Sequence, residues 1–285
     1  RFGLEDMAAR VRCEPGRLED FDRLCAILRA EKPDAVFHLA AQPIVLEARR
    51  EPFPTLDANV RGTYHLLEAV RRHAPVSRVV VVASDKVYGE AAHLPYREDD
   101  VLGGLDVYDA SKVCVDVLAR SYARNFDMAI AVARAGNFYG PGDSQWSRIV
   151  PGTVRSLFEG VAPTLRSDGR PLRDYFYVED AADALLLLGE AARAKDVRGQ
   201  AFNFGTGTPT SVLDVVRRII ACSGFDVEPV VEGVVRGEIS EQYLDCSKAE
   251  RVLGWRYATP LAEGIGRAWA WYARVFRERG VGDGC

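Results

Sequence analysis

Hydroxyl, acidic and basic side chains follow one apolar run of the sequence. The valines at 79–82 lead into Ser84, Asp85 and Lys86, and Tyr108 and Lys112 come a short way further along the chain. Open α/β sheets place their chemistry just outside the carboxyl ends of the strands. These five residues are therefore the first candidates for a catalytic site, with a hydroxyl and a phenol for proton transfer, a carboxyl group and two amines.

The spacing of Tyr108 and Lys112 predicts that they share one face of a helix, because residues four apart are neighbours on a helix surface. An ammonium close to a phenol favours the phenolate, so we expect Lys112 to lower the pKa of Tyr108 and make it a base. The spacing alone is common by chance, and an exposed pair without a role is the alternative.

Apolar runs that alternate with helix-length segments predict the elements that position these residues. The strands are expected at 34–40, 78–83, 128–134 and 200–204, and the first helices at 53–73 and 111–126. This alternation is typical of right-handed βαβ units and a parallel sheet, so the fold class is α/β.

The rhythm changes after Asn137, where residues 140–148 form a loop rich in glycine and proline. Further helices are expected at 149–159, 178–193, 211–223, 247–253 and 259–279. Ser247 and Glu250 have the spacing of a capping box, and Gly254 follows as a stop signal.

Composition limits the classes of function. The chain has 285 residues, of which 48% are apolar, and a formal net charge of -4, which argues against a nucleic-acid partner. The sequence has no run of about 18 apolar residues, so we expect no membrane span. The six cysteines are scattered without metal-ligand spacing, so we expect no metal and reduced thiols in a cytoplasmic protein.

Three further motifs accompany the candidate site: His-Leu-Ala-Ala-Gln at 38–42, Asn-Val-Arg-Gly-Thr at 59–63 and Arg-Ala-Gly-Asn at 134–137. Together with Ser84, Tyr108 and Lys112, they resemble the extended short-chain dehydrogenase/reductase family of NAD-dependent nucleotide-sugar epimerases and dehydratases. The resemblance extends from residue 16 to 255. It implies a Rossmann-like, doubly wound parallel sheet with a smaller, interleaved C-terminal substrate-binding lobe. Residues 1–145 would form the NAD-binding domain, to which 172–206 return, and 146–285 mainly the substrate lobe.

The resemblance also implies a reaction. Ser84, Tyr108 and Lys112 would serve the hydride exchange with NAD that the family shares, whereas an acidic residue directly after the serine is typical of 4,6-dehydratases. Asp85 would then be the acid that protonates the departing C6 hydroxyl. An Asp-Lys pair resembles the CDP-glucose enzymes, since the dTDP-glucose enzymes have Asp-Glu. Lys86 thus holds the position of the base that removes the C5 proton, with Glu98 as an alternative base.

We therefore expect a lyase with bound NAD that converts CDP-glucose to CDP-4-keto-6-deoxyglucose. The nucleotide base stays open, because residues 173–180 look more like the dTDP-glucose and epimerase branches. A 4-epimerase or UDP-glucuronate decarboxylase is the nearest alternative, and a non-catalytic nucleotide-sensing protein is the alternative from another class.

The binding residues also follow from the resemblance. The NAD site is expected to involve Leu39, Ala40, Ala41, Gln42, Asn59, Tyr108 and Lys112. The nucleotide-sugar site is expected to involve Asn137, Arg148, Arg173, Arg236 and Glu238. Arginine suits the diphosphate, because a guanidinium binds phosphate oxygens in pairs.

Two departures from the family pattern concern the cofactor. The glycine-rich turn for the pyrophosphate and the acidic residue for the adenosine ribose would lie ahead of Arg1, so the chain as printed is expected to hold NAD poorly. Arg17 replaces a carboxylate that meets adenine in relatives, which leaves NADP open. The resemblance finally implies a homodimer in which helices 53–73 and 111–126 pair across a two-fold axis.

Overall fold

In the part of the chain that the structure describes, the main sheet has four parallel strands in the order β1, β2, β3, β7. The computed structural model describes residues 11–90, 93–234 and 239–278. The strands are β1 (Ala35–His38), β2 (Arg78–Val82), β3 (Ile130–Ala135) and β7 (Ala201–Phe204). Side chains alternate along β2, so Val79 and Val81 enter one core and Val80 enters another. The sheet is therefore buried on both faces, as the near-continuous valine run predicts.

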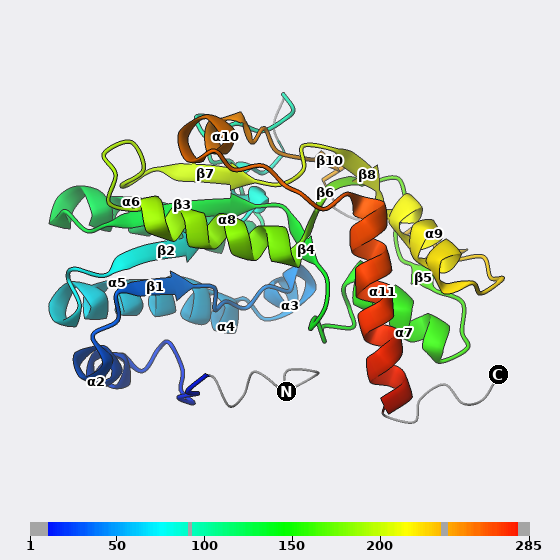
Figure 1. The fold of residues 1–285 in the computed structure, drawn as a ribbon, viewed down its shortest axis with the longest axis horizontal. Coiled ribbons are helices and arrows are strands. Elements are labelled where there is room, and N and C mark those ends of the chain that lie inside the picture. Colours follow the sequence, from blue (N-terminus) through cyan, green and yellow to red (C-terminus); the bar gives the residue numbers. More distant parts are fainter. Residues whose placement is uncertain (1–10, 91–92, 235–238, 279–285) are drawn as a thin grey trace.

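Helices cover both faces of this sheet (Figure 1). One face packs against α2 (Phe21–Glu31), α5 (Gly62–His73) and α6 (Val107–Phe126), and the other against α8 (Val178–Ala191) and α10 (Ser247–Leu253). This arrangement confirms the predicted doubly wound α/β fold.

A second, smaller lobe lies beyond the carboxyl ends of β1 and β2, toward which their arrowheads point in Figure 1. Its helices are α7 (Ile149–Phe158), α9 (Val212–Ser223) and α11 (Leu261–Glu278). Its strands are β4 (Asn137–Tyr139), β6 (Leu172–Tyr177), β8 (Pro209–Ser211) and β10 (Glu241–Gln242), with β5 (Thr164–Leu165) and β9 (Val230–Val231) as a separate pair. The chain thus enters the second lobe, returns to the main sheet with α8 and β7, and then enters the second lobe again. The domain boundaries expected from the sequence stay a prediction.

A buried carboxylate connects the two parts. Asp174 of β6 accepts hydrogen bonds from the Thr206 amide and hydroxyl, both at 2.7 Å, and from the Gly207 amide at 3.0 Å. Gly205 allows this approach, because a Cβ atom there would lie 2.4 Å from an Asp174 oxygen. The turn after β7 is therefore held directly on a strand of the second lobe.

Some elements differ from the sequence-based expectation. The helix expected at 53–73 consists of α4 (Pro52–Leu56), a π-helical turn (Asp57–Arg61) and α5, preceded by α3 (Val45–Arg50). The helix expected from residue 111 begins at Val107. The prediction of a capping box at Ser247 is wrong. The N-cap residue of α10 is Cys246, and the Ser247 amide donates a hydrogen bond of 2.8 Å to the Asp245 carboxylate.

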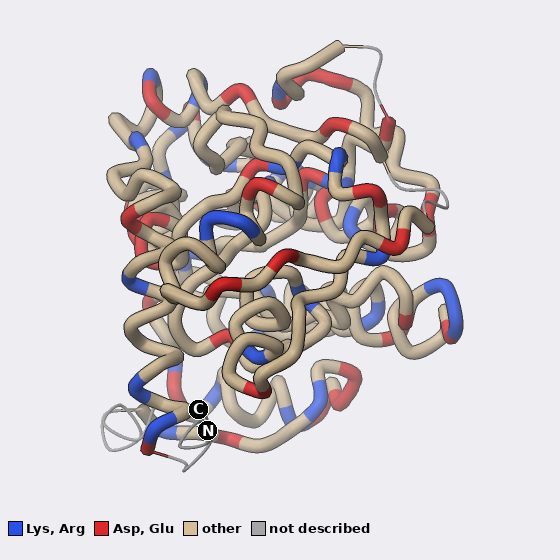
Figure 2. Tube along the Cα trace, turned by 90° about the vertical axis from the view of Figure 1, so that its right-hand side faces the viewer, with Lys and Arg blue, Asp and Glu red and all other residues tan. Residues whose placement is uncertain are grey.

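Charged residues of both signs are interspersed along the trace in Figure 2. Among the described residues, no helix combines the length and apolar character needed to cross a bilayer, and no three His, Cys, Asp or Glu side chains are placed to hold a metal ion.

Candidate active site

The first part of the site is a 3₁₀ turn, Asp85–Tyr88, directly after β2. The Ser84 hydroxyl oxygen accepts from the Lys86 amide at 3.2 Å, and its proton is donated to Oδ1 of Asp85 at 2.9 Å. Asp85 is only 3% exposed, and its Oδ2 has no hydrogen-bond partner within the described part of the chain. The turn therefore presents a buried carboxyl group with one oxygen unpaired.

The second part is the first two turns of α6. Tyr108 and Lys112 are both buried, and the Tyr108 hydroxyl shares a hydrogen bond with Ser84. The Lys112 ammonium donates to the carbonyl of Val82, the last residue of β2, at 3.0 Å. The predicted common helix face is thus directed at the carboxyl end of the central strand.

The prediction that Lys112 lowers the pKa of Tyr108 is wrong for this arrangement. Burial raises the pKa of the Tyr108 phenol, and the charge of Asp85 raises it further. Burial also lowers the pKa of Lys112 to about 8, because its ammonium loses solvation. Desolvation is the largest cause of both shifts, and the Lys112 charge is not among the main influences on the pKa of Tyr108.

Asp85 is in an environment that favours its neutral form. Burial raises the pKa of this carboxyl group, while Lys86, the Ser84 hydrogen bond and Arg173 act in the opposite direction. Asp174 adds repulsion that raises the pKa again. A carboxyl group with a raised pKa can hold a proton and donate it, as a general acid must.

Asn59 holds the loop after β1 against α6. Its Oδ1 accepts from the Gln42 amide at 2.7 Å, and its Nδ2 donates to the Gln42 carbonyl at 3.1 Å and to Ser111 Oγ at 2.9 Å. Asn59 lies in the π-helical turn, a local widening that is frequent at functional sites. The structure thus brings Asn59 and Gln42 together and ties them to the helix with Tyr108 and Lys112.

His38 at the end of β1 has the local hydrogen bond that the sequence predicts. Its Nε2 lies 2.8 Å from Thr63 Oγ1, whose proton is donated to the Asn59 carbonyl. The histidine therefore donates to Thr63. Burial, with the charge of Lys112, lowers the pKa of His38 to about 4.

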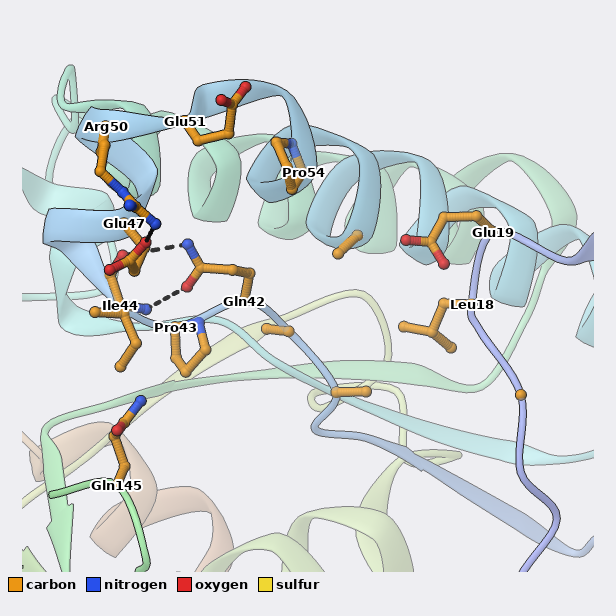
Figure 3. A pocket seen from close by; sticks show the side chains of 14 residues that line it. Leu18, Glu19, Gln42, Pro43, Ile44, Glu47, Arg50, Glu51, Pro54 and Gln145 are labelled. Carbon is orange, nitrogen blue, oxygen red and sulfur yellow. Dashed lines mark hydrogen bonds and ion pairs between the residues drawn. The ribbon is translucent and has the colours of Figure 1, made fainter.

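A cavity of about 670 Å³ opens beside the loop after β1 (Figure 3). Leu18 and Glu19 lie on one side, across from Gln42 and Pro43, and Gln145 comes from the loop after β4. Ala40 and Ala41 also line it, whereas Leu39 is half-exposed. The volume falls in the range of about 300–1,000 Å³ of small-molecule sites, and mixed apolar and polar walls fit part of a dinucleotide.

Two of the predicted substrate residues act on the catalytic candidates. Arg173 is buried in β6, and its charge lowers the pKa of Asp85. Arg148 is ion-paired with Asp143 at 3.0 Å, and its charge acts on Tyr108. Asn137 lies beside Asp174, with Nδ2 at 3.5 Å from its carbonyl.

Three predicted residues are not placed at this site. Arg236 and Glu238 lie outside the described residues. Glu98, the alternative base, accepts the Asn203 amide proton in β7 at 2.8 Å and lines a separate charged depression with Lys248.

Sequence reasoning missed three residues. Asp109, next to Tyr108, is 6% exposed, and its Oδ1 has no hydrogen-bond partner in the described chain. Gln242 of β10 is fully buried and lies opposite Arg173 of β6. Neither its side-chain amide nitrogen nor its amide oxygen has a hydrogen-bond partner among the described residues. Glu19 lines the cavity two positions after Arg17, to which it is ion-paired at 3.1 Å. Asp109 could have been found from the sequence, because it directly follows Tyr108. The position of Gln242 beside Arg173 could not, because it depends on the register between β10 and β6.

A parallel sheet with serine, tyrosine and lysine at its carboxyl edge, and a nucleotide-sized cavity beside it, defines an α/β enzyme of the short-chain dehydrogenase/reductase type. Residues 4–205 match the NAD dependent epimerase/dehydratase family. The chain belongs to this family, and NAD is its cofactor.

This chain is similar to 4,6-dehydratases and also to a 4-epimerase. A CDP-glucose 4,6-dehydratase of Salmonella typhimurium is 30% identical over 276 residues, 92% of this chain and 77% of the relative. The crystal structure of a UDP-glucose 4-epimerase from Thermotoga maritima has a TM-score of 0.89 at 26% identity, covering 96% of this chain and 88% of the other. A dTDP-glucose 4,6-dehydratase double mutant from Streptomyces venezuelae, solved with NAD bound, has a TM-score of 0.86 at 27% identity, covering 96% and 83%.

Proposed function

We propose that this chain is an NDP-sugar 4,6-dehydratase, a lyase that uses NAD and converts CDP-glucose to CDP-4-keto-6-deoxyglucose. The observation that supports dehydration over epimerisation is Asp85. Epimerisation at C4 needs no acid for a departing hydroxyl, whereas this buried carboxyl group has a raised pKa beside Ser84 and Tyr108. The Asp-Lys pair and the similarity to a CDP-glucose enzyme support the cytidine nucleotide.

The cofactor would lie along the loop after β1, where Ala40, Ala41 and Gln42 line the cavity and Lys112 lies close to β2. When bound, NAD supplies a hydride acceptor for C4 and later a hydride donor for C6. A cationic nicotinamide held beside Tyr108 would favour the phenolate of Tyr108, in the direction opposite to burial.

The protein groups handle the protons. Tyr108, hydrogen-bonded with Ser84, takes the proton of the C4 hydroxyl as C4 becomes a ketone. The ketone acidifies C5-H. Lys86, which holds the position of the family's C5 base, is proposed to accept this proton while the C5-H electron pair forms the C5-C6 double bond, and to return it to C5 when hydride returns to C6. Asp85 donates a proton to the C6 oxygen, so the C6-O bond breaks and water departs.

The substrate diphosphate is proposed to bind Arg173 and Arg148, with Asn137, Arg236 and Glu238 toward the nucleotide. Arg173 is buried, so its guanidinium is less screened than a surface charge and better placed to hold a phosphate. We also propose that the protein acts in the cytoplasm.

The test is incubation of the full-length protein and NAD with CDP-glucose, dTDP-glucose and GDP-mannose, followed by mass spectrometry. A mass loss of one water with formation of a 4-keto-6-deoxy product is expected for CDP-glucose. Interconversion of UDP-sugars without loss of water would instead assign a 4-epimerase, and loss of carbon dioxide from UDP-glucuronate a decarboxylase.

A further inference from the structure

Arg134 of β3 is the largest side chain that is completely buried among the described residues. It continues the row of Ile130 and Val132 on the face of the main sheet that α6 covers. A guanidinium keeps its charge inside a protein, so its N–H groups need strong acceptors there. The proposed mechanism does not use this buried cation.

One edge of the Arg134 guanidinium binds α6. Its Nε donates to Oδ2 of Asp116 at 2.8 Å, and its Nη2 donates to Oδ1 at 3.2 Å. Asp116 lies on α6 and is also completely buried. Tyr108, Lys112 and Asp116 follow one another at intervals of four residues, so they share one face of the helix. Arg134 therefore holds the third member of a row whose first two members are catalytic candidates.

The remaining nitrogen of the guanidinium binds the turn after β2. Nη1 of Arg134 donates to the Tyr88 hydroxyl and to the Glu98 carbonyl, both at 3.0 Å. The Tyr88 hydroxyl donates its own proton to Oδ1 of Asn203 in β7 at 2.6 Å. This hydroxyl thus both accepts and donates, which fixes its position. Tyr88 is the last residue of the 3₁₀ turn that begins with Asp85.

The backbone of the same turn is held by the loop at Gly104. The Gly104 amide donates to the Val87 carbonyl at 3.1 Å. A Cβ atom at Gly104 would lie 2.7 Å from the Lys86 carbonyl oxygen, so glycine permits this approach. The loop fixes the backbone of the turn, whereas the Tyr88 hydroxyl links the turn to α6 through Arg134.

Stability alone does not require a buried ion pair of this kind. Replacement of both partners by apolar side chains is often neutral or stabilising, because two charges no longer have to be desolvated. Apolar side chains cannot, however, supply directional bonds from one planar group to two different elements. The pair between Arg134 and Asp116 is therefore suited to fixing geometry.

We propose that Arg134 is a positioning residue that fixes the turn after β2 relative to α6, by bonding Tyr88 of the turn and Asp116 of the helix at once. Ser84, directly before the turn, and Tyr108 of α6 share a hydrogen bond across these two elements. Arg134 acts on this pair through the backbone and touches no substrate. The inference rests on the part of the proposed function in which Ser84 and Tyr108 move the C4 proton, a step that dehydration and epimerisation share.

Tyr88→Phe tests the link with one atom. The variant keeps the ring that stacks on Tyr96, with 4.9 Å between the ring centroids, but the turn loses its bond to Arg134. We expect kcat to fall by about 10- to 100-fold, because a small misplacement of a proton-transfer group is costly. KM should stay close to the wild-type value. In a Ser84→Ala background the same change should cost little more, because the geometry that it disturbs is already lost.

Tyr139→Phe is the matched control. Tyr139 is a buried tyrosine of β4 whose hydroxyl donates to the Leu261 carbonyl at 3.4 Å in the second lobe, so kcat should not change. The double variant Arg134→Met/Asp116→Leu separates position from stability. It should melt close to the wild-type temperature and yet turn over at least as slowly as Tyr88→Phe.

The deciding measurement is carbon-13 NMR of the full-length protein, labelled at the hydroxyl-bearing ring carbon of tyrosine, with the Tyr108 resonance assigned by Tyr108→Phe. It needs no substrate, so failure to convert any nucleotide sugar counts against the proposed function alone. A Tyr108 resonance that moves in Tyr88→Phe but not in Tyr139→Phe supports the inference. A resonance that does not move in Tyr88→Phe, or that moves equally in Tyr139→Phe, overturns it. If Tyr88→Phe does not fold, an unmoved resonance in Arg134→Met/Asp116→Leu overturns it equally.

Discussion

At the scale of single residues, burial decides how the ionisable groups of this site behave. The pKa of Asp85 and that of Tyr108 are both raised by desolvation, whereas those of Lys112 and His38 are lowered. In each case the neutral form is favoured, because a charge loses solvation in the interior. Desolvation therefore shifts each of these groups toward its neutral form.

Asp85→Asn tests the acid directly. An amide cannot protonate the departing hydroxyl, so elimination should fall by about 100-fold or more, the usual contribution of a general acid. Oxidation at C4 should continue slowly, because Ser84, Tyr108 and Lys112 are unchanged. Mass spectrometry of the product and the absorbance of the reduced nicotinamide separate the two steps. Wild-type elimination in the variant would mean that another group is the acid.

His38 makes stability depend on pH below neutrality. Its pKa is about 4 in the folded chain, against the ordinary value of 6.5 for a solvated histidine, so the unfolded chain binds more protons between these values. The free energy of unfolding should therefore fall as pH drops from 6.5 to 4, by on the order of 3 kcal/mol from this residue. Urea unfolding at several pH values should show a flatter dependence in His38→Gln, with His73→Gln as control. Equal slopes in wild type and His38→Gln would contradict the assignment.

At the scale of elements, the sequence predicts the strands and helices of the main sheet well, because burial periodicity is a local property. It does not predict β6, whose Arg173 and Asp174 would be unusual in a buried strand. Their partners, Thr206 and Gly207 for Asp174, lie far along the chain. The order of Ser84, Tyr108 and Lys112 was visible in the sequence, but the raised pKa of Tyr108 depends on tertiary burial.

The π-helical turn gives a second test at this scale. Asn59→Ala removes three hydrogen bonds and leaves the Gln42 amide without its partner. We expect a loss of about 2–4 kcal/mol in the free energy of unfolding, from the cost of unpaired buried groups. Denaturant unfolding measures it, and Asn125→Ala on the exposed end of α6 should change little. A loss as small as that of the control would show that the loop after β1 does not depend on Asn59.

At the scale of the whole molecule, the helices α4, α5 and α6 expose apolar side chains. Phe53 is 70% exposed, Tyr64 38% and Val117 51%. These lie on the helices that the family resemblance predicts to pair in a homodimer, which stays a prediction. Exposed apolar residues on adjoining helices are the kind of surface that a second copy would cover.

Val117→Lys should therefore shift a dimer toward monomer, because it would place a charge in the contact. Sedimentation velocity of the full-length protein measures the change. Val161→Lys is the control, since Val161 is 52% exposed and follows α7 in the second lobe. If the wild-type protein sediments as a monomer, the prediction of a homodimer is wrong.

The carboxylate of Asp174 has a consequence for how the molecule unfolds. It accepts the amide protons of Thr206 and Gly207, so the turn that ends the main sheet cannot open without releasing a strand of the second lobe. Hydrogen exchange at these two amides should be nearly as slow as in β3, although they lie in a turn. Fast exchange there would show that the turn opens alone. With slow exchange, the two lobes unfold as one cooperative unit, and heating gives a single transition.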